Sequence, residues 1–308
     1  MERSVSAALA VLVSAVLLGS AVFLGPANRA YAHTFQGGES AEFLTTIQVI
    51  DVQASLAVEN ASDPEVAAEH IEHAAEELDE DTLDEIAERN ERIATDLPAS
   101  LEDLQAAIQA GDTDLDARLT TLTNLLGEAV SVRIESDQLS NSTVQAVVVS
   151  NLVNEALVHY GEAIGSEMNM TDMSSMNTTD SGMESGSMGG MEGSMEGPVE
   201  VVNEVDYQSS LAYAQRAQER YGEIKADAIE GTEDAVGKLD SAFPDFVAAI
   251  ENKGTDMDVM RVAHLEIHPN LMVAYNLQII PEFPLPLLLL IPAMAGAILY
   301  GRFSMKRI

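Results

Sequence analysis

The stretch SEMNMTDMSSMNTTDSGMESGSMGGMEGSMEGP, residues 166–198, most constrains how this chain of 308 residues can fold. Gly, Ser, Thr and Asn dominate the stretch, and a segment of this composition cannot bury a core. We therefore expect a disordered linker over residues 166–199, with folded segments on either side. Apolar residues make up 46% of the whole chain, which is enough for real cores in those segments.

The segments on both sides of the linker have helical patterns. Residues 39–59 contain no helix breaker, and their apolar residues recur at helical spacing. Asp63-Pro64 predicts a helix start, because Asp is a good N-cap and Pro suits the first helical position. Gly111-Asp112 separates two later helices, and a helix over residues 143–164 closes the first half. Strand signals are nearly absent, so the sequence predicts an all-α fold.

An internal similarity links the two halves of the chain. The octet DVQASLAV, residues 51–58, matches DYQSSLAY, residues 206–213, at its Asp, Gln, Ser, Leu and Ala positions. LEDLQAAI, which ends at Ile108, resembles FPDFVAAI, which ends at Ile250. We interpret these matches as two related up-and-down helical bundles, residues 33–165 and 200–278. Chance similarity between amphipathic helices is the alternative.

The N-terminal residues 1–32 have the pattern of a secretory signal peptide. Arg3 precedes a long apolar stretch, and the tripeptide Ala-Tyr-Ala at 30–32 has the small-x-small pattern of a cleavage site. An uncleaved membrane anchor is the alternative, because the apolar run is long enough to span a bilayer. Cleavage after Ala32 would make His33 the first residue, with an amino group and an imidazole that could chelate a metal ion together.

The C-terminal residues 281–308 combine three features. Pro281-Glu282-Phe283-Pro284 precedes an apolar run over residues 285–300, and a basic cluster containing Arg302 and Arg307 follows it. The apolar run is just long enough for one membrane span, and the basic cluster belongs on the cytoplasmic side. The arrangement resembles the PEF-type C-terminal sorting signals of archaeal surface proteins.

This resemblance implies that a membrane transpeptidase, an archaeosortase, cleaves near the motif and transfers the protein to a lipid. A plain C-terminal transmembrane anchor is the alternative interpretation. Both interpretations place residues 33–280 on the outer face of the cell membrane. Four Asn-x-Ser/Thr sequons are compatible with glycosylation of such a surface protein. They lie at Asn60, Asn141, Asn169 and Asn177.

The charge of the chain favours cations as partners. It has 51 acidic residues against 15 basic ones, a net charge of −36, so nucleic acid and anionic membrane surfaces would repel it. The acidity could equally serve solubility in salty surroundings. The chain has no cysteine, which excludes disulfides, thiolate nucleophiles and cysteine metal sites. A transition-metal site would need His, Met, carboxylate or the amino terminus.

The linker is rich in methionine, and eight of the 14 methionines of the chain lie in it. Thioether sulfur binds Cu(I) well, and flexible spacings such as Met168-x-Met170 and Met173-x-x-Met176 can gather two or three sulfurs around one ion. An exposed thioether otherwise invites oxidation. The sequence therefore predicts soft-metal binding here, with expansion of a low-complexity tract as the alternative.

A second candidate metal site lies near the end of the second unit. His264 and His268 are four residues apart, so both imidazoles lie on one helix face, and Met257 and Met260 continue the same stripe. Thioether ligands without thiolate favour copper over zinc. The alternative is that this stripe packs in the bundle core, with Pro269 kinking the helix.

The remaining histidines have weaker patterns. His70 and His73 lie in an acidic helix, where we expect them to face solvent. His159 lies between Glu155 and Glu162, so a carboxylate-histidine cluster is possible there. A ferritin-like di-iron centre would need Glu-x-x-His segments, and the chain contains none. Hydrolase and nucleotide-binding motifs are absent as well, so the sequence predicts no enzyme.

The sequence as a whole predicts a surface-anchored, non-enzymatic helical protein that binds or buffers metal ions, with copper as the leading ion. A structural or adhesive surface protein without a metal role is one alternative. An iron-uptake accessory protein is another, because VVNEVDYQSSLAYAQRAQERYGEI, residues 201–224, resembles a helix in the extracytoplasmic domains of bacterial high-affinity iron permeases.

Overall fold

The computed structural model describes residues 38–172 and 198–277, and within these ranges all the regular structure is helical. This confirms the predicted all-α class. The helices are α2 (Gly38–Glu59), α3 (Pro64–Glu76), α4 (Glu80–Ala110), α5 (Leu115–Arg133), α6 (Ser136–Leu139), α7 (Ser142–Ile164), α8 (Glu204–Ile224), η2 (Lys225–Asp227), α9 (Glu233–Glu251), α10 (Asp256–Arg261), the π-helix η3 (Val262–Ile267) and α11 (His268–Tyr275).

Local chemistry sets the helix ends. The Asp63 carboxylate accepts from the backbone amides of Glu65 and Val66, and Pro64 is the first residue of α3. Gly111 ends α4 with a φ of 66°, a left-handed conformation that favours glycine. Both helix boundaries predicted from the sequence are confirmed, and so are the predicted helices over residues 39–59 and 143–164.

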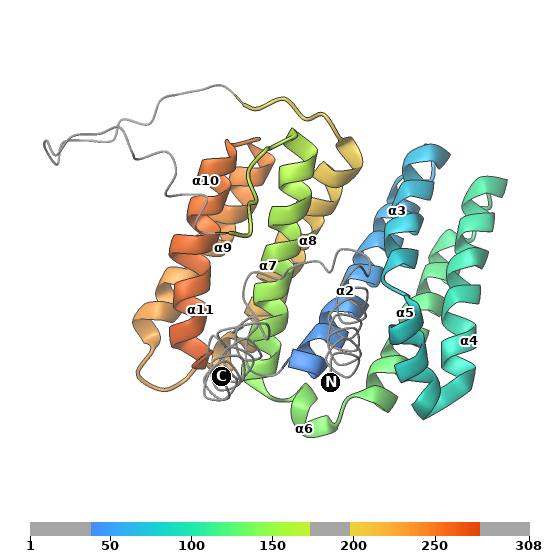
Figure 1. Ribbon diagram of the computed structural model, residues 1–308, viewed down its shortest axis with the longest axis horizontal. Coiled ribbons are helices and arrows are strands. Elements are labelled where there is room, and N and C mark those ends of the chain that lie inside the picture. The colour runs from blue at the N-terminus through green and yellow to red at the C-terminus, as the bar shows by residue number, and fades with distance from the viewer. Residues whose placement is uncertain (1–37, 173–197, 278–308) are drawn as a thin grey trace, which may run out of the picture. The chain divides into compact units, whose positions relative to one another are not determined.

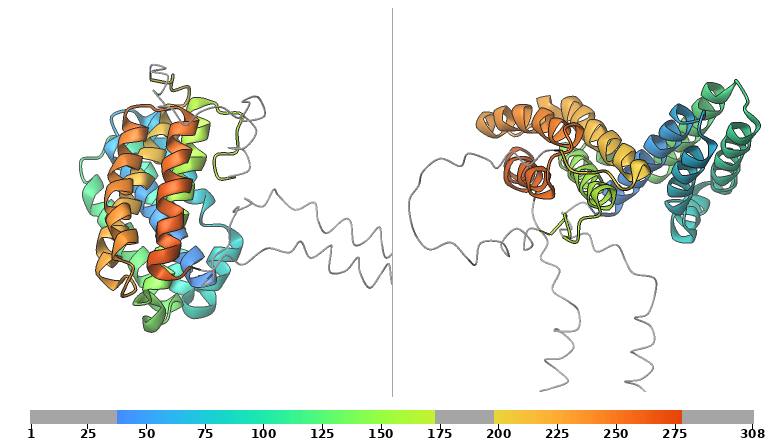
Figure 2. Two further views of the ribbon diagram at one scale, coloured as in Figure 1. Left: turned by 90° about the vertical axis from the view of Figure 1, so that its left-hand side faces the viewer. Right: turned by 90° about the horizontal axis from the view of Figure 1, so that it is seen from above.

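The helices pack in two neighbouring groups (Figure 1). In the first group, α2 packs on α3 and α5, and α4 packs on α5. In the second group, α7 packs chiefly on α8, and α9 contacts α8, η3 and α11. The groups meet where α2 contacts α7 and α8, as the view from above in Figure 2 shows. The predicted duplication into two related units stays a prediction.

Buried apolar residues of both groups belong to one hydrophobic cluster. Ile50 and Leu126 in the first group and Phe243 and Phe246 in the second are at most 2% exposed. The α7 helix joins them, because nearly all its residues from Val144 to Ala163 are buried. Burial of α7 on several sides explains why its apolar residues, such as those of the run 146–149, are not confined to one face.

The C-terminal end of α7 is tied to the N-terminal end of α8. The carbonyl of Ala163 accepts hydrogen bonds from the backbone amides of Val202 and Asn203, at 2.8 and 3.1 Å. Further along, the Ser210 hydroxyl donates to the Ala156 carbonyl at 2.8 Å. These bonds set the register between the two helices and therefore decide which side chains of α7 and α8 meet.

Several predicted features lie outside the described residues. These are the signal peptide over 1–32, His33, Met173, Met176, Asn177, the motif Pro281-Glu282-Phe283-Pro284 and the apolar run after it. Among the helices of residues 38–172 and 198–277, none is both long enough and apolar enough to span a bilayer.

Candidate metal centre

Three side chains from three helices converge beside the junction of the two helix groups. His73 of α3, His159 of α7 and Asp206 of α8 each offer a ligand atom, and these atoms lie within 4.8 Å of one another. The Nδ1 of His159 is 2.7 Å from Oδ1 of Asp206, and the ring centroids of the two histidines are 5.5 Å apart. Two imidazoles and one carboxylate form a donor set that binds divalent transition metals.

The start of α8 holds Asp206 in place. Asn203 caps this helix, because its Oδ1 accepts from the backbone amides of Val205 and Asp206 at 3.0 and 3.3 Å. Its Nδ2 also donates to Oδ2 of Asp206. The carboxylate lies in the first helical turn, where the helix dipole favours negative charge. Asp206 therefore presents Oδ1 toward His159 while Asn203 binds the other oxygen.

His159 is confined from two sides. Its ring lies against the ring of Tyr213, with centroids 5.3 Å apart, and its side chain is 11% exposed. The Tyr213 hydroxyl lies 2.6 Å from the side-chain amide of Gln53, and this hydrogen bond ties the ring to α2. Side chains that orient a ligand imidazole in this way usually strengthen metal binding.

His73 contributes a nitrogen without a hydrogen-bond partner. Its Nδ1 is buried, although the residue as a whole is half-buried. A buried polar atom without a partner is costly unless a ligand satisfies it, and the ring that carries this nitrogen lies beside a second imidazole and a carboxylate.

His70, one helical turn before His73, is the centre of a buried polar network. Its Nδ1 lies 2.8 Å from Oε1 of Gln53, and its Nε2 lies 3.0 Å from Oε1 of Gln208. Burial is the main cause of a lowered pKa of the His70 imidazole, and the nearby imidazoles of His73 and His159 lower it further. The Gln208 hydrogen bond and the charge of Asp206 act in the opposite direction.

The neutral His70 ring needs one acceptor and one donor. Gln208 Oε1 can accept from Nε2, and a half-turn of the Gln53 amide gives Nδ1 a donor. The hydroxyls of Ser209 and Tyr213, which face the same amide, can then rotate and donate to its oxygen. The network therefore fits the neutral ring that burial favours.

The expectation that His70 and His73 face solvent is wrong. His70 is fully buried and His73 is half-buried, because α3 packs against α2 and also contacts α8. The apolar residues of α3 alone predict a buried side that is too narrow. Polar side chains on α2 and α8 can bind histidine, so the buried side of α3 also includes His70. The predicted carboxylate-histidine cluster is present at His159, where Oε2 of Glu162 lies 3.8 Å from Nδ1.

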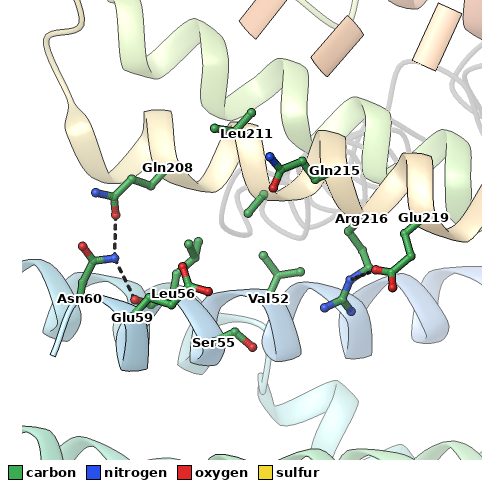
Figure 3. Close-up of a pocket in the computed structure, with 11 residues that line it drawn as sticks. Val52, Ser55, Leu56, Glu59, Asn60, Gln208, Leu211, Gln215, Arg216 and Glu219 are labelled. Carbon is green, nitrogen blue, oxygen red and sulfur yellow. Dashed lines mark hydrogen bonds and ion pairs between the residues drawn. The ribbon is translucent and has the colours of Figure 1, made fainter. Parts of the chain in front are cut away.

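A cleft of about 540 Å³ opens between α2 and α8 next to this network. Figure 3 shows Asn60, the residue directly after α2, joined to Gln208 of α8 at one end, where Nδ2 of Asn60 donates to Oε1 of Gln208 at 2.9 Å. Val52, Leu56 and Leu211 form apolar parts of its wall. Gln208 thus contacts the cleft on one side and His70 on the other.

The second predicted histidine pair is buried in the core. His264 and His268 are 1% and 9% exposed, with ring centroids 5.3 Å apart, and Met260 is fully buried. Met257 is half-buried. This burial is what the alternative interpretation of the stripe, packing in the bundle core, predicts, and the metal role of these residues stays a prediction.

The beginning of the predicted linker packs onto the same region. Met170 is 3% exposed, and its carbonyl oxygen lies 2.8 Å from Nε2 of His264. The Met170 sulfur lies against Gly161 of α7. Met168 is half-buried and packs against the core cluster. The structure thus brings Met170 close to His264, and Met170 forms part of the core.

Three of the four predicted glycosylation sites lie in the described ranges. Asn141 and Asn169 are exposed, whereas Asn60 is half-buried and donates to Gln208. Asn141 also caps α7 by accepting from the Thr143 amide. Asn169 accepts from the Thr171 hydroxyl at 2.8 Å. The two exposed side chains are the accessible ones of the three.

Sequence reasoning missed His73 and Asp206 as ligands. One signal pointed toward Asp206, because the residue opens the second copy of the repeated octet, at the start of a capped helix. Nothing in the sequence pairs α3 with α8. Comparison of the chain with protein-family models, with curated proteins and with solved structures gave no match.

Proposed function

We propose that this protein is a metal-binding protein of the cell surface and that His73, His159 and Asp206 are ligands of the ion. The observation that supports this function is the convergence of three ligand side chains within 4.8 Å. Each comes from a different helix, so the folded chain prepares the site before an ion arrives. Preparation of this kind lowers the entropy that binding must overcome.

Copper is the ion that we propose first. For sites made of nitrogen and oxygen donors, Cu(II) binds more tightly than the other divalent ions of the first transition row. Two imidazoles and a carboxylate are such donors, and no thioether is needed. The net charge of −36 adds a general attraction for cations, which raises their concentration near the surface.

Iron is the second candidate, and the donor set itself favours it. Two histidines and one carboxylate with open coordination positions are also the ligands with which many proteins hold Fe(II). A role in iron uptake, as the resemblance of residues 201–224 implies, would use the same three side chains. Titration with both ions separates the candidates.

The surface location rests on the two ends of the sequence. Residues 1–32 resemble a secretory signal, and residues 281–308 resemble a sorting signal or a membrane anchor. N-terminal sequencing of the protein purified from its membrane fraction tests the first, and the mass of the C-terminal peptide tests the second. A start at His33 is the expected result.

The decisive experiment is titration of the metal-free full chain with Cu(II), Zn(II) and anaerobic Fe(II) in competition with a coloured chelator. We expect one ion per chain, with Cu(II) bound most tightly. The variants His73→Ala, His159→Ala and Asp206→Asn should each lose at least about tenfold in affinity. Glu88→Gln is the matched control, since Glu88 is an exposed carboxylate on α4.

Circular dichroism of each variant separates loss of the site from loss of the fold. Stoichiometric binding that all three variants retain would contradict the assignment of the ligands. The absence of binding by the wild-type chain for all three ions would contradict the function itself and would favour a structural or adhesive role.

A further inference from the structure

Two carboxylates, one buried and one exposed, converge on the same ring nitrogen of His159. Oδ1 of Asp206 lies 2.7 Å from Nδ1, and Oε2 of Glu162 lies 3.8 Å from it. Glu162 is one helical turn after His159 on α7, so the two side chains lie on one face of that helix. Asp206 and Glu162 therefore both lie next to Nδ1 of His159, with Glu162 just outside the group of three residues whose ligand atoms lie within 4.8 Å of one another.

The spacing of these atoms suits a shared ion. Neighbouring ligand atoms about 2.0 Å from an ion lie about 2.8 Å apart in the tetragonal geometry of Cu(II) and about 3.3 Å apart around a tetrahedral ion. The distance of 2.7 Å from Nδ1 to Asp206 matches the first value, and the distance of 3.8 Å from Nδ1 to Glu162 is longer than both. An ion that replaces the proton between His159 and Asp206 would therefore draw Glu162 in by about 0.5–1 Å.

The two carboxylates differ in how firmly they are held. The side chain of Asp206 is 8% exposed and is fixed by Asn203, whereas that of Glu162 is 59% exposed. An exposed glutamate can rotate between solvent and the site at little cost. Solvent therefore reaches the site from the direction of Glu162.

We propose that Glu162 is the fourth ligand of the ion and that the ion enters and leaves the site by exchange at this position. This inference rests on the proposed function. His73, His159 and Asp206 hold the ion from the buried side, and Glu162 closes the site toward solvent. Release then requires rotation of one exposed side chain and leaves the helices in place, which suits a protein that takes up and passes on an ion.

The test compares Glu162→Gln, Glu162→Asp and Glu88→Gln with wild type in the full chain. Glu162→Gln removes the charge, and Glu162→Asp keeps the charge on a side chain that is one methylene shorter. We measure Cu(II) affinity by chelator competition, the rate of Cu(II) removal by excess chelator, and the electron paramagnetic resonance spectrum of the bound ion.

If Glu162 is a ligand, both substitutions at 162 lower affinity by about tenfold or more, speed Cu(II) removal and change the spectrum. Glu88→Gln, which loses the same charge, changes none of these. If Glu162→Gln binds Cu(II) more weakly but Glu162→Asp binds it as tightly as wild type, the carboxylate attracts the ion by its charge alone. That result would overturn ligation by Glu162.

Two further outcomes distinguish a failure of this inference from a failure of the proposed metal-binding function. If wild type binds one Cu(II), His159→Ala does not, and Glu162→Gln binds as tightly as wild type with the same spectrum, the fourth-ligand inference is wrong and the ion occupies the other nitrogen of His159. If wild type binds no ion, the proposed function fails, and this inference fails with it. The exposure of Glu162 makes unfolding of its variants unexpected, and circular dichroism checks this.

Discussion

The carboxylate of Asp206, in the first turn of α8, lies 2.7 Å from the Nδ1 of His159 near the end of α7. The contact exists because the Ala163 carbonyl accepts from two amides immediately before α8. The end of one helix and the start of the next are thereby held side by side. The ligand cluster is a consequence of how the chain returns to α7 after residues 166–199.

Asp206→Asn should separate the charge of this residue from its shape. Asparagine keeps the size of the side chain but has one oxygen where Asp206 has two, so it cannot accept from both His159 and Asn203, and we expect a stability loss of about 1–3 kcal/mol from the buried hydrogen bond that is lost. Metal affinity should fall by at least about tenfold, because a neutral amide is a poor ligand. Chelator competition and urea unfolding measure the two effects.

Asp245→Asn is the control for this substitution, because Asp245 is exposed on α9. Equal affinities for Asp206→Asn and Asp245→Asn would contradict a role for Asp206 in the site.

Asn203→Ala should weaken both the helix and the metal site. It removes the N-cap of α8 and the donor to Oδ2 of Asp206, so we expect a loss of about 1 kcal/mol in the free energy of unfolding and a lower metal affinity. Asn141→Ala removes the matching cap of α7 and is expected to cost a similar amount without changing affinity. Urea unfolding and metal titration of both variants form the test, and an equal loss of affinity in the two would show that helix stability alone controls binding.

The helices themselves were predictable because their signals are local. Asp63-Pro64 and Gly111 act within a few residues of the backbone groups that they satisfy, so the sequence alone reveals them. The interpretation of His70 failed for the opposite reason. Its partners are Gln53 on α2 and Gln208 on α8, and the amide that accepts from Nε2 is 138 positions away in sequence.

The repeated octet had a consequence that its sequence did not reveal. Gln53 and Gln208 occupy equivalent positions in the two copies, and in the structure both contact the single imidazole of His70. The similarity predicted two related helices. It could not predict that they meet across a third helix, because that contact depends on how α2, α3 and α8 pack.

Burial of His70 predicts a pH dependence of stability. Its pKa is lowered from the ordinary value of 6.5, so the unfolded chain takes up a proton at a higher pH than the folded chain does. Between those two values the unfolded state binds more protons, and stability therefore falls as pH falls below about 6.5. His70→Gln should remove this part of the loss.

Urea unfolding at a series of pH values between 7.5 and 5 measures this loss for wild type and for His70→Gln. The difference between the two curves isolates His70 from the many carboxylates that also titrate. If the unfolding free energies of wild type and His70→Gln change in parallel with pH, the folded protein stabilises the charged His70 imidazole as well as water does. That result would contradict the prediction.

Met170→Ala should behave as a core substitution. The side chain is 3% exposed, and shortening a buried methionine to alanine usually costs about 2–5 kcal/mol. Met170→Leu, which keeps most of the volume, should cost less than about 1.5 kcal/mol. Cu(II) affinity should stay unchanged in both, since His73, His159 and Asp206 are elsewhere. A loss of affinity in Met170→Leu without a loss of stability would instead support the thioether as a ligand.

Gly161→Ala tests the contact between α7 and Met170 directly. A Cβ at this position would lie 3.2 Å from the Met170 sulfur, which is closer than an ordinary contact, while alanine in a helix interior gains up to about 1 kcal/mol over glycine. In wild type these effects oppose each other. In the Met170→Ala background the sulfur is gone, so Gly161→Ala should stabilise the protein by about 1 kcal/mol. A double-mutant cycle from urea unfolding measures the coupling, and additive effects of the two substitutions would show that the sulfur yields to the new methyl group without cost.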